Sequence, residues 1–294
     1  MIDFLKDDKI VFKKGDAFSL KKLDPEYTAG LVKEDGKELF ETIHLKLHEL
    51  QDKLFASRKK SLLLVFQAMD AAGKDGTIKS VMQGINPQGC QVVSFKKPTE
   101  LELQHDFLWR GNLVLPSLGQ IGIFNRSYYE EVLVTRVHPE FILAQNLQGY
   151  NTIESIDREF WHRRFQSINA YERHLTENGT VILKFFLHVS KEEQKKRFLE
   201  RIEEPEKNWK FNYRDLEERK NWHLFQDAYE DAIQHTATDN APWHVIPANS
   251  NWFRNLCVCS ILSKTLQNMD LEYPVLSPQS KALLEKGKSE LESE

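Results

Sequence analysis

Residues 66–81, FQAMDAAGKDGTIKSV, have the residue types and the spacing of a phosphate-binding loop. The common pattern is G-x-x-x-x-G-K-[ST]. Gly73 and Lys74 match its second half, whereas Ala68 replaces the first glycine and Asp75 replaces the hydroxyl residue. Backbone N–H groups at a helix start carry about half a positive charge and point at bound anions. We expect Lys74 to pair with the phosphate oxygens that are transferred; a plain glycine turn is the alternative. The candidate phosphate-binding residues here are Ala71, Ala72, Gly73, Lys74, Asp75, Gly76 and Thr77.

Asp70 lies inside this loop, where a carboxylate works against anion binding. At about 5 Å and an effective dielectric constant of about 20, its repulsion of a phosphate charge is roughly 3 kcal/mol. A magnesium ion between the two groups reverses the sign, because Mg²⁺ prefers carboxylate and phosphate oxygens. We interpret Asp70 as a metal ligand that replaces the missing hydroxyl. The alternative is that Asp70 is the N-cap of the following helix.

A second group of candidates follows the third apolar strand. Asn125 stands where many phosphate-loop enzymes have a magnesium-binding aspartate, and as a neutral group it binds a metal only weakly. Glu130 is the nearest acid that compensates. Arg126 emerges at the carboxyl end of the strand, where ligands of open α/β sheets bind; the alternative is a surface ion pair. Tyr128 and Tyr129 are either core residues or a platform for a stacked base.

Four cations around Trp209 predict a lid over the phosphates. Arg197 and Arg201 stand four residues apart, on one face of a helix. Lys207 and Lys210 follow in a polar, aromatic segment. Closure of such a segment places positive charge on the groups that react. The same stretch is rich in glutamate, so a solvated, salt-bridged helix face is the alternative.

The elements that must position these residues alternate between strands and helices. Apolar runs predict strands at 61–69, 90–95, 120–124, 181–189 and 243–248. Helical spacing and capping signals predict helices at 34–56, 75–83, 99–113, 154–177, 190–202, 213–236 and 251–269. The capping boxes are Thr99 with Glu102 and Ser190 with Glu193. This order implies βαβ units and a parallel sheet with helices on both faces. We expect one domain over 1–294: an arm and helix (1–56), a core (57–270) with the lid near 197–214, and an exposed tail (271–294).

Composition narrows the class of protein. No run of about 18 apolar residues occurs in the 294, so no membrane span is expected, and the N-terminus lacks the apolar region of a signal peptide. The cysteines, Cys90, Cys257 and Cys259, form neither a disulfide framework nor a zinc pattern, which favours the cytoplasm. The net charge of −4 argues against a nucleic-acid partner, so any polyanion must be held by local basic clusters.

Several segments together resemble the polyphosphate kinase 2 family, over roughly residues 35–270. They are QAMDAAGKDGTI, PTELELQHDFLWR, FNRSYYEEVLVTRVHP, ILKFFLHVSKEEQKKR, PEKNWKF and APWHVIPANSNWFRN. The resemblance implies an α/β P-loop kinase fold similar to thymidylate kinase, with a five-stranded parallel sheet between helices and a helical lid. Many members have Asp at the position of Asn125. Asn there, with Glu at 130, resembles the branch that accepts both AMP and ADP.

The resemblance implies a reversible, Mg²⁺-dependent transfer of the terminal phosphate of polyphosphate to AMP or ADP, with Mn²⁺ as an alternative metal. The expected catalytic residues are Asp70, Lys74, Arg126 and Glu130. The expected lid ligands of polyphosphate are Arg197, Arg201, Lys207 and Lys210. The expected nucleotide-binding residues are Asp106, Arg110, Asn125, Arg126 and Tyr128. Asp70 would hold the metal, with Asn125 or Glu130 as a further ligand.

The expected partners are inorganic polyphosphate and adenine nucleotides, with guanine nucleotides as an alternative, and the expected assembly is a homodimer or homotetramer. Two other functions remain open at this point. One is an ATP-dependent nucleoside monophosphate kinase, which shares the fold and the lid. The other is a catalytically silent protein that binds polyphosphate or nucleotides, an idea that only Asn125 supports.

Overall fold

The computed structural model describes residues 10–294, so the first nine residues of the predicted arm lie outside the described part. One sheet has the strand order β1-β6-β5-β2-β4-β3. Its strands are β1 (Val11–Phe12), β2 (Ser61–Ala68), β3 (Cys90–Ser94), β4 (Ile121–Asn125), β5 (Thr180–His188) and β6 (Trp243–Pro247). The predicted five strands, β2 to β6, are all parallel, and β1 pairs antiparallel with β6. The α/β fold is therefore confirmed, with one short edge strand added.

The added strand shows that the arm is tied to the sheet. Ile10 O accepts from Val245 N at 2.8 Å, and Leu20 N donates to the Glu230 carboxylate at 2.8 Å. A two-residue strand is too short to show a period of two, so the sequence pattern predicted only irregular cover here.

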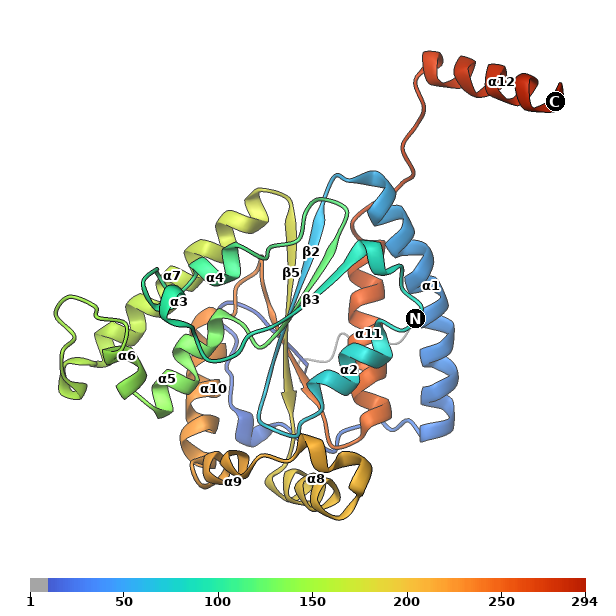
Figure 1. Ribbon diagram of the computed structural model, residues 1–294. Helices are drawn as coiled ribbons and strands as arrows, with labels where there is room; N and C mark the ends of the chain where they lie inside the picture. Colours follow the sequence, from blue (N-terminus) through green and yellow to red (C-terminus); the bar gives the residue numbers. More distant parts are fainter. Residues whose placement is uncertain (1–9) are drawn as a thin grey trace.

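Helices cover both faces of the sheet (Figure 1). One face carries α1 (Lys33–Ser57), α2 (Lys74–Val81) and α11 (Asn251–Gln267). The other carries α4 (Trp109–Asn112), α5 (Val134–Val137), α7 (Arg158–Glu177) and α10 (Trp222–Thr236). Two further helices, α8 (Lys191–Glu203) and α9 (Tyr213–Lys220), lie at the end of the molecule toward which β5 points. Short helices occupy the connections: η2 (Leu20–Lys22), η3 (Pro87–Gly89), α3 (Glu100–Leu103), η4 (Tyr128–Val132), α6 (Glu140–Leu143), η5 (Ile153–Ser155) and η6 (Pro205–Lys210).

Two predicted helices are each divided in the structure. The helix expected over 99–113 consists of α3, which begins with the predicted Thr99–Glu102 capping box, and α4. The helix expected over 213–236 breaks into α9 and α10 at Asn221. At Ser190, only half of the expected box forms. Ser190 caps the Glu193 N–H, while the Glu193 carboxylate binds Arg197 at 2.9 Å.

A fully buried ion pair joins α7 to the centre of the sheet. Lys184 Nζ donates to Glu172 at 2.7 Å and to the Thr236 carbonyl oxygen at 2.7 Å, and neither charged side chain is exposed. Tyr128 and Tyr129 both donate to the same carboxylate, at 2.9 and 2.8 Å. Burial lowers the pKa of Lys184, against the attraction of Glu172. The pair thus fixes the segment that follows β4.

Glu172→Gln is expected to destabilise the fold by about 3–5 kcal/mol, because it leaves a buried ammonium without a counter-charge. Denaturant unfolding measures this loss. The double variant Glu172→Gln/Lys184→Met is expected to lose less than the single one, since no buried charge remains. Equal losses in the two variants would show that the charge of Lys184 does not matter.

The C-terminal tail ends in α12 (Pro278–Glu292), which lies apart from the sheet and its covering helices (Figure 1). No residue of α12 is buried, in agreement with the exposed tail predicted from the sequence. No helix within residues 10–294 is long and apolar enough to cross a membrane.

Candidate active site

The phosphate loop follows β2 directly and leads into α2. Gly73 is the N-cap of α2, with φ +103°, a value that favours glycine. Asp70 lies three residues earlier and caps nothing, so the N-cap alternative for it is wrong. β2 and β4 are neighbours, with Phe66 opposite Asn125. Because parallel strands end at the same edge, the residues after β4 lie beside the loop.

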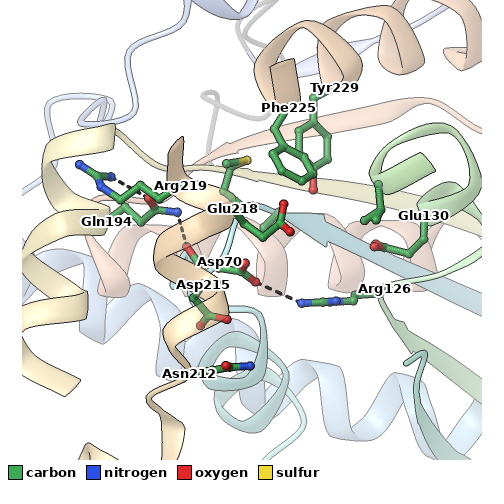
Figure 2. Close-up of a pocket in the computed structure, with 13 residues that line it drawn as sticks. Asp70, Arg126, Glu130, Gln194, Asn212, Asp215, Glu218, Arg219, Phe225 and Tyr229 are labelled. Carbon is green, nitrogen blue, oxygen red and sulfur yellow. Dashed lines mark hydrogen bonds and ion pairs between the residues drawn. The ribbon is translucent and has the colours of Figure 1, made fainter. Parts of the chain in front are cut away.

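Asp70 and Arg126 form the central contact of the site. Arg126 Nη2 lies 3.1 Å from Asp70 Oδ1 (Figure 2). Arg126 has φ +64°, uncommon for a residue with a side chain, and its N–H donates to the Phe66 carbonyl oxygen at 3.0 Å. The ion pair of Arg126 is therefore made with the phosphate loop itself.

Lys74 and Glu130 complete a cluster of alternating charges with this pair. Burial and the nearby Arg126 lower the pKa of Lys74, whereas Asp70, Glu130 and Asp75 oppose that shift. Burial raises the pKa of Glu130, against Arg126 and Lys74. The four predicted catalytic residues thus lie close enough to perturb one another, an arrangement frequent at functional sites.

Asn125 contacts the loop through Asp75. Its Nδ2 donates to Asp75 Oδ1 at 2.6 Å, and both residues line the same groove. Asn125 was predicted to bind the nucleotide, but it faces the phosphate loop. An aspartate at this position would place two carboxylates in contact, so the neutral amide removes a repulsion.

Asn125→Asp is expected to lower the melting temperature in EDTA by about 2–4 °C, the shift for a cost of about 1 kcal/mol. Mg²⁺ is expected to restore that temperature and to saturate the variant at a lower concentration, because a second carboxylate is available. Thermal unfolding with and without Mg²⁺ measures both effects. Asn125→Ala is the control, since it removes the hydrogen bond without adding charge. If Mg²⁺ rescues both variants equally, Asn125 does not lie next to a metal.

A groove of about 1070 Å³ runs between the loop and the helices α8 and η6. The described residues that line it include eleven Lys and Arg against four Asp and Glu, whereas the whole chain has a net charge of −4. The cations are Lys74, Lys96, Lys97, Arg126, Lys196, Arg197, Arg201, Lys207, Lys210, Arg214 and Arg254. Such a local excess attracts a polyanion.

The predicted lid cations line this groove, yet several are also paired. Arg201 contacts Asp215 at 3.2 Å, and Lys207 contacts Glu204 at 2.8 Å. Lys210 lies over the ring of Trp209, at 5.1 Å. The segment predicted as a lid is therefore a salt-bridged helix face that lines the groove, and its role as a lid stays a prediction.

Two predicted phosphate ligands are corrected, because their polar groups are used inside the protein. Arg197 donates from all three nitrogens: to Glu193, to the carbonyl oxygens of Ala71 and Ala72, and to those of Ala248 and Asn249. The buried Thr77 hydroxyl donates to Gly73 O and accepts from Arg254 Nε at 2.6 Å. Arg197 and Thr77 therefore hold the phosphate loop in place through hydrogen bonds inside the protein.

A second, largely apolar pocket of about 330 Å³ lies on the other side of Arg126. Its lining includes Phe95, Pro98, Leu103, Arg110, Val134 and Phe141. Arg110, predicted to bind the nucleotide, does line it: the guanidinium lies 5.3 Å from the Phe95 ring and donates to Lys96 O at 2.7 Å.

Of the other two predicted nucleotide ligands, one is corrected and one stays a prediction. Tyr128 is completely buried and hydrogen-bonded to Glu172, so it is a core residue and not a stacking platform. Asp106 lies outside the lining of the apolar pocket but lines a small adjoining hollow with Arg110, and its carboxylate accepts from Leu108 N at 2.9 Å, so its role in nucleotide binding stays a prediction.

A third hollow of about 220 Å³ shares lining residues with both the groove and the pocket, and α9 contributes to its wall (Figure 2). Asp70, Arg126 and Glu130 line it from the sheet edge, and Asp215 and Glu218 line it from α9. Arg126 lines all three spaces. Burial, and then the charge of Asp70, raise the pKa of Asp215, so the two carboxylates face a common space.

The residues present fit a hard divalent cation. Asp70 supplies carboxylate oxygens beside the anion-binding loop, and within residues 10–294 no cluster of three His, Cys, Asp or Glu forms a complete metal cage. Mg²⁺ is commonly held in this way, by one or two carboxylates with water and substrate phosphates as its other ligands.

Several residues of the site were missed by sequence reasoning. Lys96 and Lys97 follow β3 directly, so the strand-end rule that selected Arg126 could have selected them. Gln194, whose amide donates to Asp70 O at 2.9 Å, and Arg254, in the first turn of α11, gave no such signal. Their place depends on how distant helices pack.

Comparison with known proteins supports the resemblance to the polyphosphate kinase 2 family that the sequence motifs indicated. A model of the polyphosphate kinase 2 family matches residues 30–274. The chain is 50% identical over 257 residues to the ADP-polyphosphate phosphotransferase of Rhodopseudomonas palustris, which covers 87% of each chain. It is 46% identical over 259 residues to the AMP/ADP-polyphosphate phosphotransferase of Meiothermus ruber, covering 87% of this chain and 91% of that one.

A solved structure gives the same result. The crystal structure of polyphosphate kinase 2 from Arthrobacter aurescens superposes with a TM-score of 0.84 at 41% identity, covering 94% of this chain and 95% of that one. The family match includes the loop, the residues after β4 and the segment predicted as a lid, all of which line the same groove. The chain therefore belongs to the polyphosphate kinase 2 family.

Proposed function

We propose that the protein transfers the terminal phosphate of inorganic polyphosphate to AMP or ADP, reversibly. One observation carries the proposal: Arg126 lines both a long basic groove and an apolar pocket. A donor in the groove and an acceptor in the pocket would meet at this guanidinium. The names of the two relatives, an ADP-polyphosphate and an AMP/ADP-polyphosphate phosphotransferase, support the same donor and acceptors.

The groove suits polyphosphate because recognition there depends on charge. Polyphosphate has no base or other apolar group, so Lys, Arg and backbone N–H groups are its natural ligands. The pocket suits a nucleoside because it is concave and mostly apolar, with Arg110 at its wall. The acceptor's phosphates would then extend toward Arg126 and Glu130.

In the transfer, an oxygen of the acceptor's terminal phosphate attacks the terminal phosphorus of the polyphosphate. A new P–O bond forms, the bond to the next phosphate breaks, and the shortened chain keeps the bridging oxygen. Lys74 and Arg126 neutralise charge on the transferred group, and the groove and pocket hold the reactants in line. A phosphate acceptor is already anionic, so no general base is required.

Asp70 is the proposed metal ligand, with Glu130 as the nearest further carboxylate. Mg²⁺, with Mn²⁺ as the alternative, would neutralise phosphate oxygens and remove the repulsion between them and Asp70. The pairing of Asp70 with Arg126 keeps its carboxylate at the mouth of the loop, which supports this role.

A panel of acceptors tests the proposal: AMP, ADP, GMP and GDP, each with polyphosphate and Mg²⁺. We expect ADP from AMP and ATP from ADP, without added ATP. Product formed only when ATP is the donor would instead identify a nucleoside monophosphate kinase. Binding of polyphosphate without any product would identify a silent binding protein.

The remaining proposals concern the cellular location and the oligomeric state of the protein. The three cysteines are unpaired, which supports the cytoplasm as the location. A homodimer or homotetramer stays a prediction from the family resemblance, for which light scattering of the purified protein is the measurement.

A further inference from the structure

We propose that Arg254, together with Arg197, is a positioning residue that orients the phosphate loop toward its anion. This inference rests on the proposed function, because it assigns a role in binding the polyphosphate donor. Neither residue is expected to touch the reacting atoms. Both residues also line the groove, but their guanidiniums donate to carbonyl oxygens of the loop, so they act through its backbone.

The two arginines reach the loop from different helices. Arg254, in α11, donates to the Ala72 carbonyl oxygen at 2.9 Å, and Arg197, in α8, donates to the same oxygen at 2.9 Å. In a planar trans peptide, the C=O and the following N–H point in opposite directions. Holding the Ala72 oxygen inward therefore turns the Gly73 N–H away from the arginines, toward the groove that Gly73 lines.

Arg254 also fixes the first turn of α2 and the residue that begins it. Its Nε donates to Thr77 Oγ1 at 2.6 Å, and Thr77 N in turn donates to Gly73 O at 2.9 Å. A Cβ on Gly73 would lie 2.3 Å from Arg254 Nη1. The guanidinium thus fills the space beneath the glycine, which is a second reason for glycine there besides its positive φ.

The charge of Arg254 has no anionic partner inside the described chain. Only 3% of the residue is exposed, and its acceptors are neutral: Thr77, Ala72, Asn251 and Asn255. Burial and the neighbouring Arg197 lower the pKa of Arg254 to about 9. A buried charge is costly when unpaired. A polyanion above the loop is the group that would compensate it.

The test compares Arg254→Lys with the unaltered protein. Lysine keeps the charge but cannot contact Thr77, Ala72 and Asn251 at once. We expect the dissociation constant for polyphosphate, from calorimetry, to rise about tenfold, as is common when a supporting contact is removed. The KM for ADP is expected to stay unchanged. Polyphosphate is expected to raise the melting temperature less in the variant.

Arg136→Lys is the control, because Arg136 is a partly buried arginine of α5 that pairs with Asp231 at 3.3 Å, outside the three spaces of the site. It is expected to lose stability without losing polyphosphate affinity. Thr77→Val, which removes one acceptor of Arg254, is the second variant in case Arg254→Lys does not fold, and is expected to weaken polyphosphate binding in the same direction.

Unchanged polyphosphate affinity in a folded variant, or an equal rise in the KM for ADP, would overturn the proposal. Calorimetry needs no turnover. If the unaltered protein binds polyphosphate but transfers nothing, the proposed function fails while the positioning role is still measured.

Discussion

Asp70→Asn is expected to reduce kcat/KM for phosphate transfer by about 10³-fold or more, the scale of losing electrostatic stabilisation at a transferring group. Asparagine keeps the shape of the side chain and can still accept from Arg126, but it loses the charge that we propose holds Mg²⁺. Because Asn125 is neutral and contacts Asp75, we expect Asp70 to carry most of the metal binding. Steady-state assays over a range of Mg²⁺ concentrations give both the loss and its metal dependence.

The alternative role for the Asp70 carboxylate is that of a simple ion-pair partner of Arg126. The two roles differ in their dependence on metal. A metal ligand predicts that Asp70→Asn needs far more Mg²⁺, and that Mn²⁺ recovers part of the activity. An ion-pair partner predicts a loss that no metal concentration alters. Since the pair is partly exposed, with 27% of Asp70 accessible, the melting temperature should change little in either case.

Arg126→Lys is expected to lower kcat by about 10²- to 10³-fold, near the lower end of what a phosphate-transferring arginine contributes. Lysine keeps the charge but loses the planar fork that contacts Asp70 and that we propose binds the phosphates of both substrates. Because Arg126 lines the groove, the pocket and the third hollow, the KM values for polyphosphate and for ADP should both rise. Initial rates with each substrate varied in turn measure all three constants.

The matched control for this substitution is Arg163→Lys. Arg163 lies on α7 with 51% of its side chain exposed, pairs with Glu159, and lines none of the three spaces. The rate constants of the Arg163→Lys variant should stay within twofold of those of the unaltered protein, the scale of a typical surface change. If Arg126→Lys changes the KM of only one substrate, the guanidinium does not join the two sites.

Much of this site follows from the order of strands in the sequence. β2 and β4 are apolar runs that end at polar residues, and parallel strands end at one edge, so Asp70, Lys74, Arg126 and Glu130 were predicted to meet. Alternation along the chain likewise predicted the five parallel strands and most of the helices.

The predictions that failed concern residues whose side-chain direction depends on how the helices and strands pack. Tyr128 follows Arg126 by two residues, yet the 3-10 turn of η4 carries it into the core toward Glu172. Arg197 and Arg201 share a helix face by spacing, but Arg197 turns beneath the loop while Arg201 pairs with Asp215. Local spacing fixes a direction on a helix and cannot specify the element packed against it.

The most direct test of the account follows a labelled phosphate. Polyphosphate carrying ³²P is incubated with ADP, Mg²⁺ and the purified protein, with no ATP added. The account predicts that the label appears in the terminal phosphate of ATP as the polyphosphate shortens, and that Asp70→Asn prevents this at any practical Mg²⁺ concentration. ATP that forms without label, or label transfer that Asp70→Asn leaves unchanged, would contradict it.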